Sequence, residues 1–164
     1  MVNEEYRGLV YPWGRQSPIA NGEPLEVAPG VWWVRFGMPG GLDHINIWLL
    51  EDSDGWTVVD TCLKLDSAKA QWEQLFTGFM ANKPIARVIC THLHPDHIGL
   101  AGWLCERFDC ELWMTRSEYL NGSLLLSYTS DVVPSTALQF YKRAGFTDEL
   151  MTTYQQRFGT YQIV

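Results

Sequence analysis

The stretch His92-Leu93-His94-Pro95-Asp96-His97-Ile98 holds three of the four histidines of this 164-residue chain, together with one carboxylate. Neutral imidazole and carboxylate groups are the ligands that zinc and similar divalent ions prefer in proteins. A histidine-rich surface loop is the alternative interpretation. However, the flanking segments are apolar, and four ligand-type side chains fall within six positions. The stretch therefore predicts a metal site.

The order of residues in this stretch suits metal binding. The apolar residues directly before it read as a buried strand, and side chains two apart on a strand share a face, so His92 and His94 converge on one ion. Pro95 cannot extend the strand ladder, so the chain turns and brings Asp96 and His97 back toward the same place. We therefore expect one ion to take the first two histidines, and a second ion to take the aspartate and the last histidine.

The elements that follow place the motif at the end of a sheet. The Ile98–Phe108 stretch predicts a short helix, and Glu111–Met114 predicts another strand. A strand, a helix and a second strand form a parallel pair with a right-handed crossover. Ligand sites in such units lie at the carboxyl ends of the strands, where the histidines fall.

In this setting the motif resembles that of the metallo-β-lactamase superfamily, whose His-x-His-x-Asp-His pattern is matched at every defined position by residues 92–97. A second likeness lies upstream, where residues 56–61 resemble the family's strand that ends in an Asp-Thr turn. The resemblance implies that Asp60 supports a ligand histidine rather than binding the metal itself. The family usually has a glycine after this Asp-Thr pair, and this chain has Cys62. The resemblance spans roughly residues 25–115.

The resemblance implies an α/β fold, namely half of the family's αβ/βα sandwich, with a mixed sheet and helices, followed by a helical segment. We expect residues 1–24 to be an irregular arm, residues 25–115 to be the N-terminal αβ half that carries the metal motif, and residues 116–164 to be a truncated helical insertion or lid. The family completes its site with later histidines and an aspartate, and no histidine follows His97 here. We therefore expect the N-terminal half of a longer hydrolase, inactive by itself.

Local patterns before the motif predict strands over Val31–Phe36, Ile45–Leu50 and Trp56–Asp60, where apolar residues alternate between turn-forming segments. Asp66 or Ser67 is expected to cap a helix. The apolar face of that helix is formed by Trp72, Leu75, Phe76, Phe79 and Met80.

Three further helices are predicted after residue 116, and they resemble the insertion that covers the active-site mouth in glyoxalase-II-like hydrolases. On that interpretation Leu124, Tyr128 and Phe140 line a substrate lid. Plain packing of these helices on the sheet accounts for the same pattern equally well. His44 shares a strand face with Asn46, which makes His44, like Tyr128, a candidate contact to substrate.

The composition of the chain limits the partners and the cellular compartment that we expect. The net charge of −7 argues against nucleic acid, which requires a basic surface. No apolar run approaches the roughly 20 residues of a membrane span, and the N-terminus lacks a secretion signal. The four cysteines show no CxxC or disulfide pattern, which favours the cytoplasm. A half-sandwich leaves one sheet face bare, so we expect a homodimer through that face, with covering helices as the alternative.

The resemblance implies a metal-dependent hydrolase that uses one or two zinc ions, with iron or manganese as alternatives. Water on the metal loses its proton near neutral pH and attacks a carbonyl, while Asp96 orients the nucleophile or handles a proton. Thioesters and lactones are the expected small-molecule substrates, given the acidic charge and the aromatic-rich helices. The alternatives are a mononuclear iron oxygenase of the same fold and a non-catalytic interaction fragment.

Overall fold

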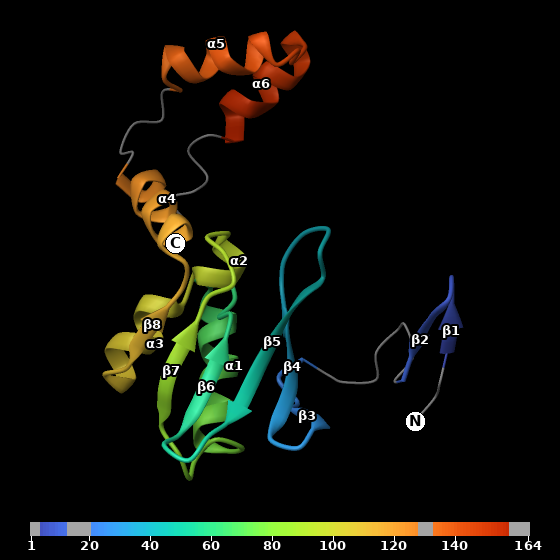
Figure 1. Cartoon of the computed structure of the whole chain (residues 1–164), viewed down its shortest axis with the longest axis vertical. Coiled ribbons are helices and arrows are strands. Elements are labelled where there is room, and N and C mark those ends of the chain that lie inside the picture. Colours follow the sequence, from blue (N-terminus) through green and yellow to red (C-terminus); the bar gives the residue numbers. More distant parts are fainter. Residues whose placement is uncertain (1–3, 13–20, 128–132, 158–164) are drawn as a thin grey trace.

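The computed structural model of the chain describes residues 4–12, 21–127 and 133–157. Its centre is a six-stranded mixed sheet in the order β3-β4-β5-β6-β7-β8 (Figure 1). The strands β3 to β6 pair antiparallel, whereas β6, β7 and β8 pair parallel. The strand bounds are β3 Leu25–Ala28, β4 Val31–Gly37, β5 His44–Glu51, β6 Trp56–Val59, β7 Ile85–Ile89 and β8 Glu111–Trp113.

Helices make the two parallel connections, as right-handed crossovers require. The helix α1 (Asp66–Thr77) joins β6 to β7, and the helices α2 (Pro95–Ile98) and α3 (Ala101–Phe108) join β7 to β8. Both α1 and α3 lie on the same face of the sheet (Figure 1). This arrangement confirms the predicted α/β class.

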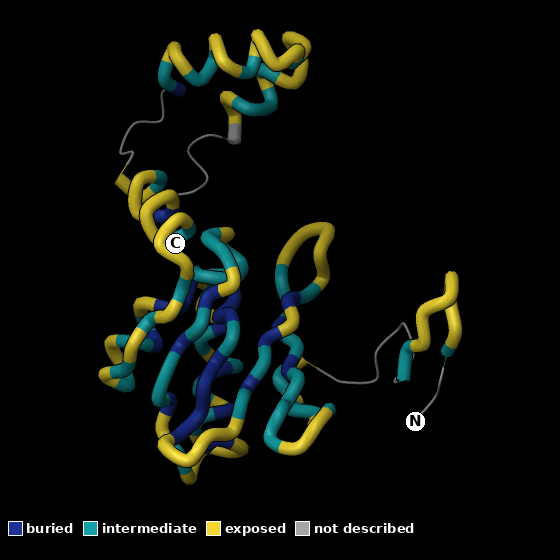
Figure 2. Tube along the Cα trace, viewed as in Figure 1, coloured by how far each residue is buried: buried dark blue, intermediate teal, exposed yellow. Residues whose placement is uncertain are grey.

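The hydrophobic core lies between the sheet and these two helices. Alternate residues of β4 and β5 are buried in it, and Trp56, Thr57 and Val58 of β6 are buried in succession, as the dark segments of Figure 2 show. The largest fully buried side chain is Trp72 of α1, whose ring centroid lies 4.9 Å from that of Phe36 on β4. Its indole nitrogen Nε1 donates to the carbonyl oxygen of Thr61 at 3.1 Å, so the core packing also holds the turn after β6.

The opposite face of the sheet mixes apolar side chains with polar ones such as Arg35, Asn46 and Arg87, and we call it the open face. Register pairs Trp33 with Trp48 across β4 and β5, and Val59 with Ile89 across β6 and β7, and these side chains share that face. Every one of them has intermediate exposure. The helices after β8 extend past the carboxyl ends of the strands rather than across this face (Figure 1).

Three local expectations were wrong, namely an irregular arm over residues 1–24, a helix that begins at Ile98, and a cap of α1 at Asp66 or Ser67. Residues 4–11 form an antiparallel hairpin of β1 (Glu4–Tyr6) and β2 (Leu9–Tyr11), because Arg7 and Gly8 both adopt positive φ, the conformation of a tight hairpin turn. The helix expected from residue 98 begins at Ala101, and Pro95–Ile98 forms a separate helical turn, since proline is pre-set for a first helical position. The N-cap of α1 is Leu65, which makes no side-chain cap bond.

Three helices follow β8, namely α4 (Arg116–Ser127), α5 (Ser135–Arg143) and α6 (Asp148–Arg157). The Tyr141 ring of α5 packs 4.7 Å from that of Phe146 and 4.4 Å from that of Tyr154 on α6. Within the described ranges, no helix has both the length and the apolar character needed to span a bilayer.

Candidate metal centre

The histidine motif begins where β7 ends, at the edge where the carboxyl ends of β6, β7 and β8 meet. His92 Nε2 lies 3.0 Å from His94 Nδ1. In a tetrahedral zinc site with Zn–N bonds of 2.0–2.1 Å, two ligand nitrogens lie about 3.3 Å apart. The two ring nitrogens are therefore already close to the spacing that a shared ion requires.

A second pair of donors comes from the helical turn α2. His97 Nε2 lies 3.4 Å from Asp96 Oδ2, again close to the separation of about 3.3 Å between two ligands of one zinc ion. Both side chains are about three-quarters buried, at 23% relative exposure each. The sequence predicted these two pairs, although it placed the second pair on a loop instead of a helical turn.

The three histidine rings form one cluster. The ring centroid of His92 lies 3.9 Å from that of His97 and 4.5 Å from that of His94. Among the described residues, however, no group of three or more His, Cys, Asp or Glu side chains is arranged so that it could hold an ion. A catalytic zinc ordinarily takes three protein ligands, so the donor set fits zinc in kind and in spacing but offers only two side chains to each position.

Asp60, directly after β6, holds the motif in place through hydrogen bonds to His97 and Thr91. Its Oδ2 lies 2.8 Å from His97 Nδ1, and its Oδ1 accepts from the Thr91 backbone N–H at 2.9 Å. The Thr91 hydroxyl also donates to Oδ2 at 2.9 Å. A carboxylate bound at Nδ1 fixes the ring so that Nε2 faces Asp96, which is how such carboxylates orient histidines for a metal.

Charges within the cluster set its protonation. Burial by itself raises the pKa of Asp60, but the bonds from His97 and Thr91 outweigh burial and hold that pKa below its ordinary value. Burial by itself lowers the pKa of His97, but Asp60 outweighs it and the pKa is raised. Burial and the neighbouring imidazoles lower the pKa of His92. A neutral His92 at pH 7 is in the form that binds metals.

The turn after β6 ties the motif in place through Thr61, which sequence reasoning missed. Its N–H and its hydroxyl both donate to the carbonyl oxygen of His97, each at 2.8 Å, and the hydroxyl accepts from the Leu100 N–H at 3.1 Å. Thr91 was missed as well. The position of each threonine, directly after Asp60 and directly before His92, was the available signal.

The two buried cysteines beside the site are not arranged as ligands. Burial raises the pKa of Cys62 to about 11 and that of Cys90 to about 12, so both remain thiols at neutral pH. Cys90 Sγ lies 3.8 Å from the His97 carbonyl oxygen, and among the described residues neither thiol belongs to a group of three or more side chains that could hold an ion. Cys62 adopts a φ of 76°, which explains why glycine is usual at this position.

The structure describes some, but not all, of the residues that were predicted to contact substrate or to line a lid. His44 opens β5, which runs antiparallel to β6, so it lies at the same edge of the sheet as the motif. Its Nδ1 lies 2.6 Å from Arg35 Nη2, and burial and Arg35 lower its pKa. Tyr128 falls outside the described residues. Leu124 and Phe140 are 54% and 66% exposed, so these two side chains are not packed on the sheet.

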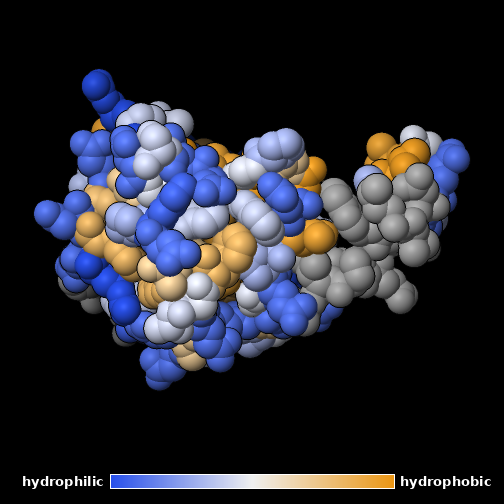
Figure 3. Space-filling view, turned by 90° about the horizontal axis from the view of Figure 1, so that it is seen from below, coloured by the Kyte–Doolittle hydropathy of each residue, from blue (hydrophilic) through white to orange (hydrophobic). Residues whose placement is uncertain are grey.

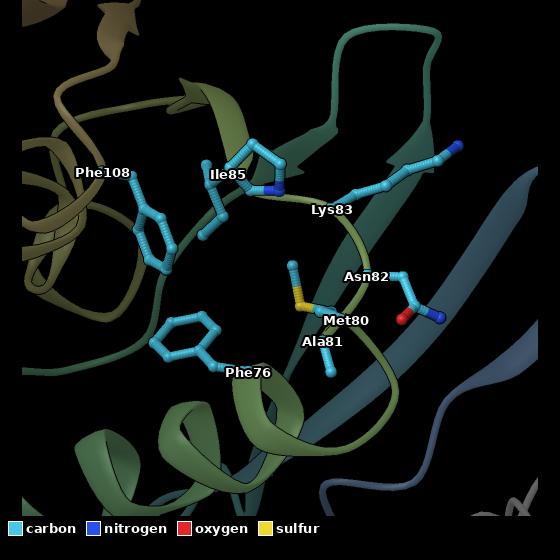
Figure 4. A pocket seen from close by; sticks show the side chains of 8 residues that line it. Phe76, Met80, Ala81, Asn82, Lys83, Ile85 and Phe108 are labelled. Carbon is cyan, nitrogen blue, oxygen red and sulfur yellow. The ribbon is translucent and has the colours of Figure 1, made fainter.

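Two hollows lie at the far end of the sheet, near the amino ends of β6 and β7. The first, of about 210 Å³, is shown in Figure 4 between Phe76, Met80, Ile85 and Phe108. The second, of about 270 Å³, is lined by Trp32, Trp56 and Phe79 with the Glu51–Lys83 ion pair. Seen from that end, apolar patches reach the surface between charged side chains (Figure 3). Neither hollow contacts the histidine motif.

Comparison with known proteins identifies the family of this arrangement. The family described as the metallo-beta-lactamase superfamily matches residues 40–151. A beta-lactamase domain protein from Burkholderia ambifaria is 45% identical, with a TM-score of 0.67 over 72% of this chain and 39% of its own. A metallo-beta-lactamase family protein from Thermus thermophilus has the same fold, with a TM-score of 0.58 and 21% identity over 80% of this chain and 43% of its own.

A curated relative adds a named activity. The linear primary-alkylsulfatase of a Pseudomonas species is 29% identical over 133 residues, which make up 80% of this chain and 18% of the relative. The chain thus spans less than half the length of each of these three proteins.

Proposed function

This chain belongs to the metallo-beta-lactamase superfamily, and from that membership and its two donor pairs we propose that it carries the metal-binding residues of a zinc-dependent hydrolase. One observation carries the proposal. His92 and His94, and separately Asp96 and His97, present donor atoms 3.0 Å and 3.4 Å apart, close to the ligand spacing of zinc.

Each residue has a distinct part in this proposal. Bound zinc lowers the pKa of coordinated water to about 7 and polarises an oxygen of the substrate. His92 and His94 bind the first ion, and Asp96 and His97 bind the second. Asp96 lies beside the reacting groups, where its carboxylate orients water or accepts a proton. Asp60 keeps His97 Nε2 turned toward the centre.

The substrate class is proposed from the surroundings of the centre. Thioesters and lactones remain the favoured substrates, given the acidic net charge of −7 and the aromatic-rich helices after β8. Neutral His44, with Nδ1 held by Arg35, keeps an Nε2 proton with which to contact a substrate oxygen. Exposed apolar side chains of α4, at Tyr119, Leu120 and Leu124, offer a surface for an acyl chain.

A second candidate reaction is hydrolysis of an alkyl sulfate ester. The observation in its favour is the likeness to the linear primary-alkylsulfatase over 80% of this chain. An alkyl chain suits the exposed leucines of α4 as well as an acyl chain does. The two candidates differ in the group that water cleaves, which is a sulfate ester in the second case and a thioester or lactone carbonyl group in the first.

Metal binding tests the proposal directly. Purified chain is titrated with zinc by calorimetry, together with the His92→Ala/His94→Ala and Asp96→Ala/His97→Ala double variants. We expect each double variant to lose one binding event, and we expect binding to weaken as the histidines protonate below about pH 6. Equal zinc binding by the unaltered chain and both double variants would overturn the assignment.

Activity assays separate the alternatives. The chain loaded with zinc, iron or manganese is tested against a thioester, a lactone and an alkyl sulfate of matched chain length. Turnover of one ester class with zinc supports a hydrolase, whereas oxygen uptake with iron alone favours an oxygenase. Metal binding with no turnover of any substrate agrees both with a hydrolase half that is inactive by itself and with the non-catalytic interaction role.

A further inference from the structure

The backbone between the two metal-binding histidines is held by a residue from another element. The Leu93 N–H donates to Glu118 Oε2 at 2.8 Å, in a partly buried contact that spans 25 positions of the chain. Glu118 is half-buried in the first turn of α4. Leu93 stands between His92 and His94, so this bond fixes the peptide that connects them.

The local sequence predicts a different hydrogen bond for the Glu118 carboxylate. Thr115-Arg116-Ser117-Glu118 has the pattern of a capping box, in which the glutamate reaches back to the backbone N–H of the threonine. One half of the box is formed, because the Glu118 N–H donates to Thr115 Oγ1 at 3.3 Å. The carboxylate oxygen Oε2, however, is directed to the histidine motif. Tertiary contact thus takes precedence over the local pattern.

A second residue of α4, Gly122, shows that this helix packs closely against Leu93. Gly122 is buried one helical turn after Glu118, on the same face of α4. A Cβ added at Gly122 would lie 3.6 Å from Leu93 Cβ, which is van der Waals contact. The helix therefore meets the motif through a charged acceptor and a close backbone approach.

We propose that Glu118 is a positioning residue of the metal centre, which holds the Leu93 peptide so that His92 and His94 converge on one ion. This inference rests on the proposed zinc site. Residues that support metal-binding histidines through hydrogen bonds change metal affinity by roughly 10–100-fold. Glu118 also links α4, with its exposed apolar side chains, to the histidines.

The test compares Glu118→Ala with Glu118→Gln, whose amide oxygen still accepts from Leu93. Cobalt binding is followed by its visible absorption, and hydrogen exchange at the Leu93 amide is measured in the metal-free chain. We expect Glu118→Ala to weaken cobalt binding about tenfold, to alter the absorption bands and to speed Leu93 exchange. Glu118→Gln should restore all three. Glu106→Ala, an exposed change on α3, is the matched control and should alter none.

The outcomes separate this inference from the metal assignment. Cobalt binding by the unaltered chain, with equal affinity and spectrum in Glu118→Ala, would overturn the positioning role alone. Failure of the unaltered chain to bind cobalt would overturn the proposed zinc site, and the positioning role with it. Weakened binding that Glu118→Gln does not restore would show that charge, not the hydrogen bond, is responsible, and would also contradict the proposal.

Discussion

Asp60 is the residue on which the candidate centre depends most, because its two oxygens hold His97 and Thr91 together. Asp60→Ala should lower zinc affinity by roughly 10–100-fold, the usual effect of removing a carboxylate behind a metal-binding histidine. Asp60→Asn keeps one oxygen for the Thr91 N–H but loses the charge that raises the pKa of His97. The metal content of each variant after dialysis against buffers of graded zinc concentration measures its zinc affinity. Unchanged zinc affinity in both variants would leave Asp60 as a turn residue only.

The Asp60–His97 pair also predicts a pH dependence of stability in the metal-free chain. The depressed pKa of Asp60 contributes stability above its ordinary value of 3.8, and that contribution is lost as the pH falls through the lowered pKa. The raised pKa of His97 contributes stability that is complete below 6.5 and is lost as the pH rises through the raised value. The pair therefore stabilises the fold most between these two limits.

Urea unfolding at several pH values measures this effect. The free energy of unfolding of the unaltered chain should exceed that of Asp60→Asn by the largest margin near about pH 5 to 6. The margin should narrow as the pH rises above 6.5 and through the raised pKa of His97, because the ring then loses its charge in both proteins. A margin that grows with pH over this range would contradict the assigned pair.

Cys62 is a fully buried residue in a left-handed conformation, with a φ of 76°. That conformation costs an ordinary residue about 1–2 kcal/mol and costs glycine little. We therefore expect Cys62→Gly to be at least as stable as Cys62→Ala in urea unfolding. The matched control is Ala68→Gly in the buried face of α1, where glycine should destabilise by about 1 kcal/mol. A Cys62→Gly protein less stable than Cys62→Ala by a similar amount would contradict the argument.

At the scale of elements, Trp72 connects α1 to the Asp-Thr turn. Its buried Nε1 donates to the Thr61 carbonyl oxygen at 3.1 Å, and Trp72→Phe leaves that oxygen without this donor. Loss of a partner from a buried polar group destabilises by about 1–3 kcal/mol. Thermal or urea unfolding of Trp72→Phe should show this loss. Trp103→Phe, at a half-buried position of α3, provides the comparison. An equal loss of stability in that variant would mean that the size of the side chain, and not the hydrogen bond, accounts for the effect.

Most elements could be predicted because their signals are local. Alternation indicated the strands near Val31–Gly37, His44–Glu51 and Trp56–Val59, and helical spacing indicated α1. The expected cap at Asp66 or Ser67 was wrong, because Leu65 occupies the N-cap position. The four-residue strand β3 was not foreseen, because it lies between Pro24 and Pro29 in a stretch rich in turn-forming residues.

The donor pairs were predictable for a similar reason, since all four side chains lie within six positions. The contacts that support them were less so, because each joins residues far apart in the chain. Thr61 meets His97 across 36 positions, and Glu118 meets Leu93 across 25. The pattern at Glu118 even favoured a local capping bond over the tertiary contact. Such contacts depend on which elements meet at the sheet edge, and one sequence does not encode that locally.

At the scale of the whole molecule, the open face of the sheet requires a cover. Trp33, Trp48, Val59 and Ile89 are only half-buried there. The nearby Arg35 Nε and Arg87 Nε atoms are buried without a hydrogen-bond partner among the described residues. A face of six strands is about 24 Å wide, and with a length of about 20 Å it presents roughly 500 Å². Pairing of two such faces buries about 1,000 Å² in total, the lower limit for a specific interface.

We propose that two copies pair through this face, in an isologous contact that shields both tryptophan pairs. Light scattering after gel filtration should give a mass near twice 18.8 kDa, and Trp48→Arg should halve it by placing a charge at the centre of the face. Leu126→Arg, on an exposed position of α4, is the matched control and should leave the dimer intact. An unaltered chain that runs as a monomer and binds no hydrophobic dye would refute the pairing, because the tryptophan, valine and isoleucine side chains of an uncovered face bind such dyes.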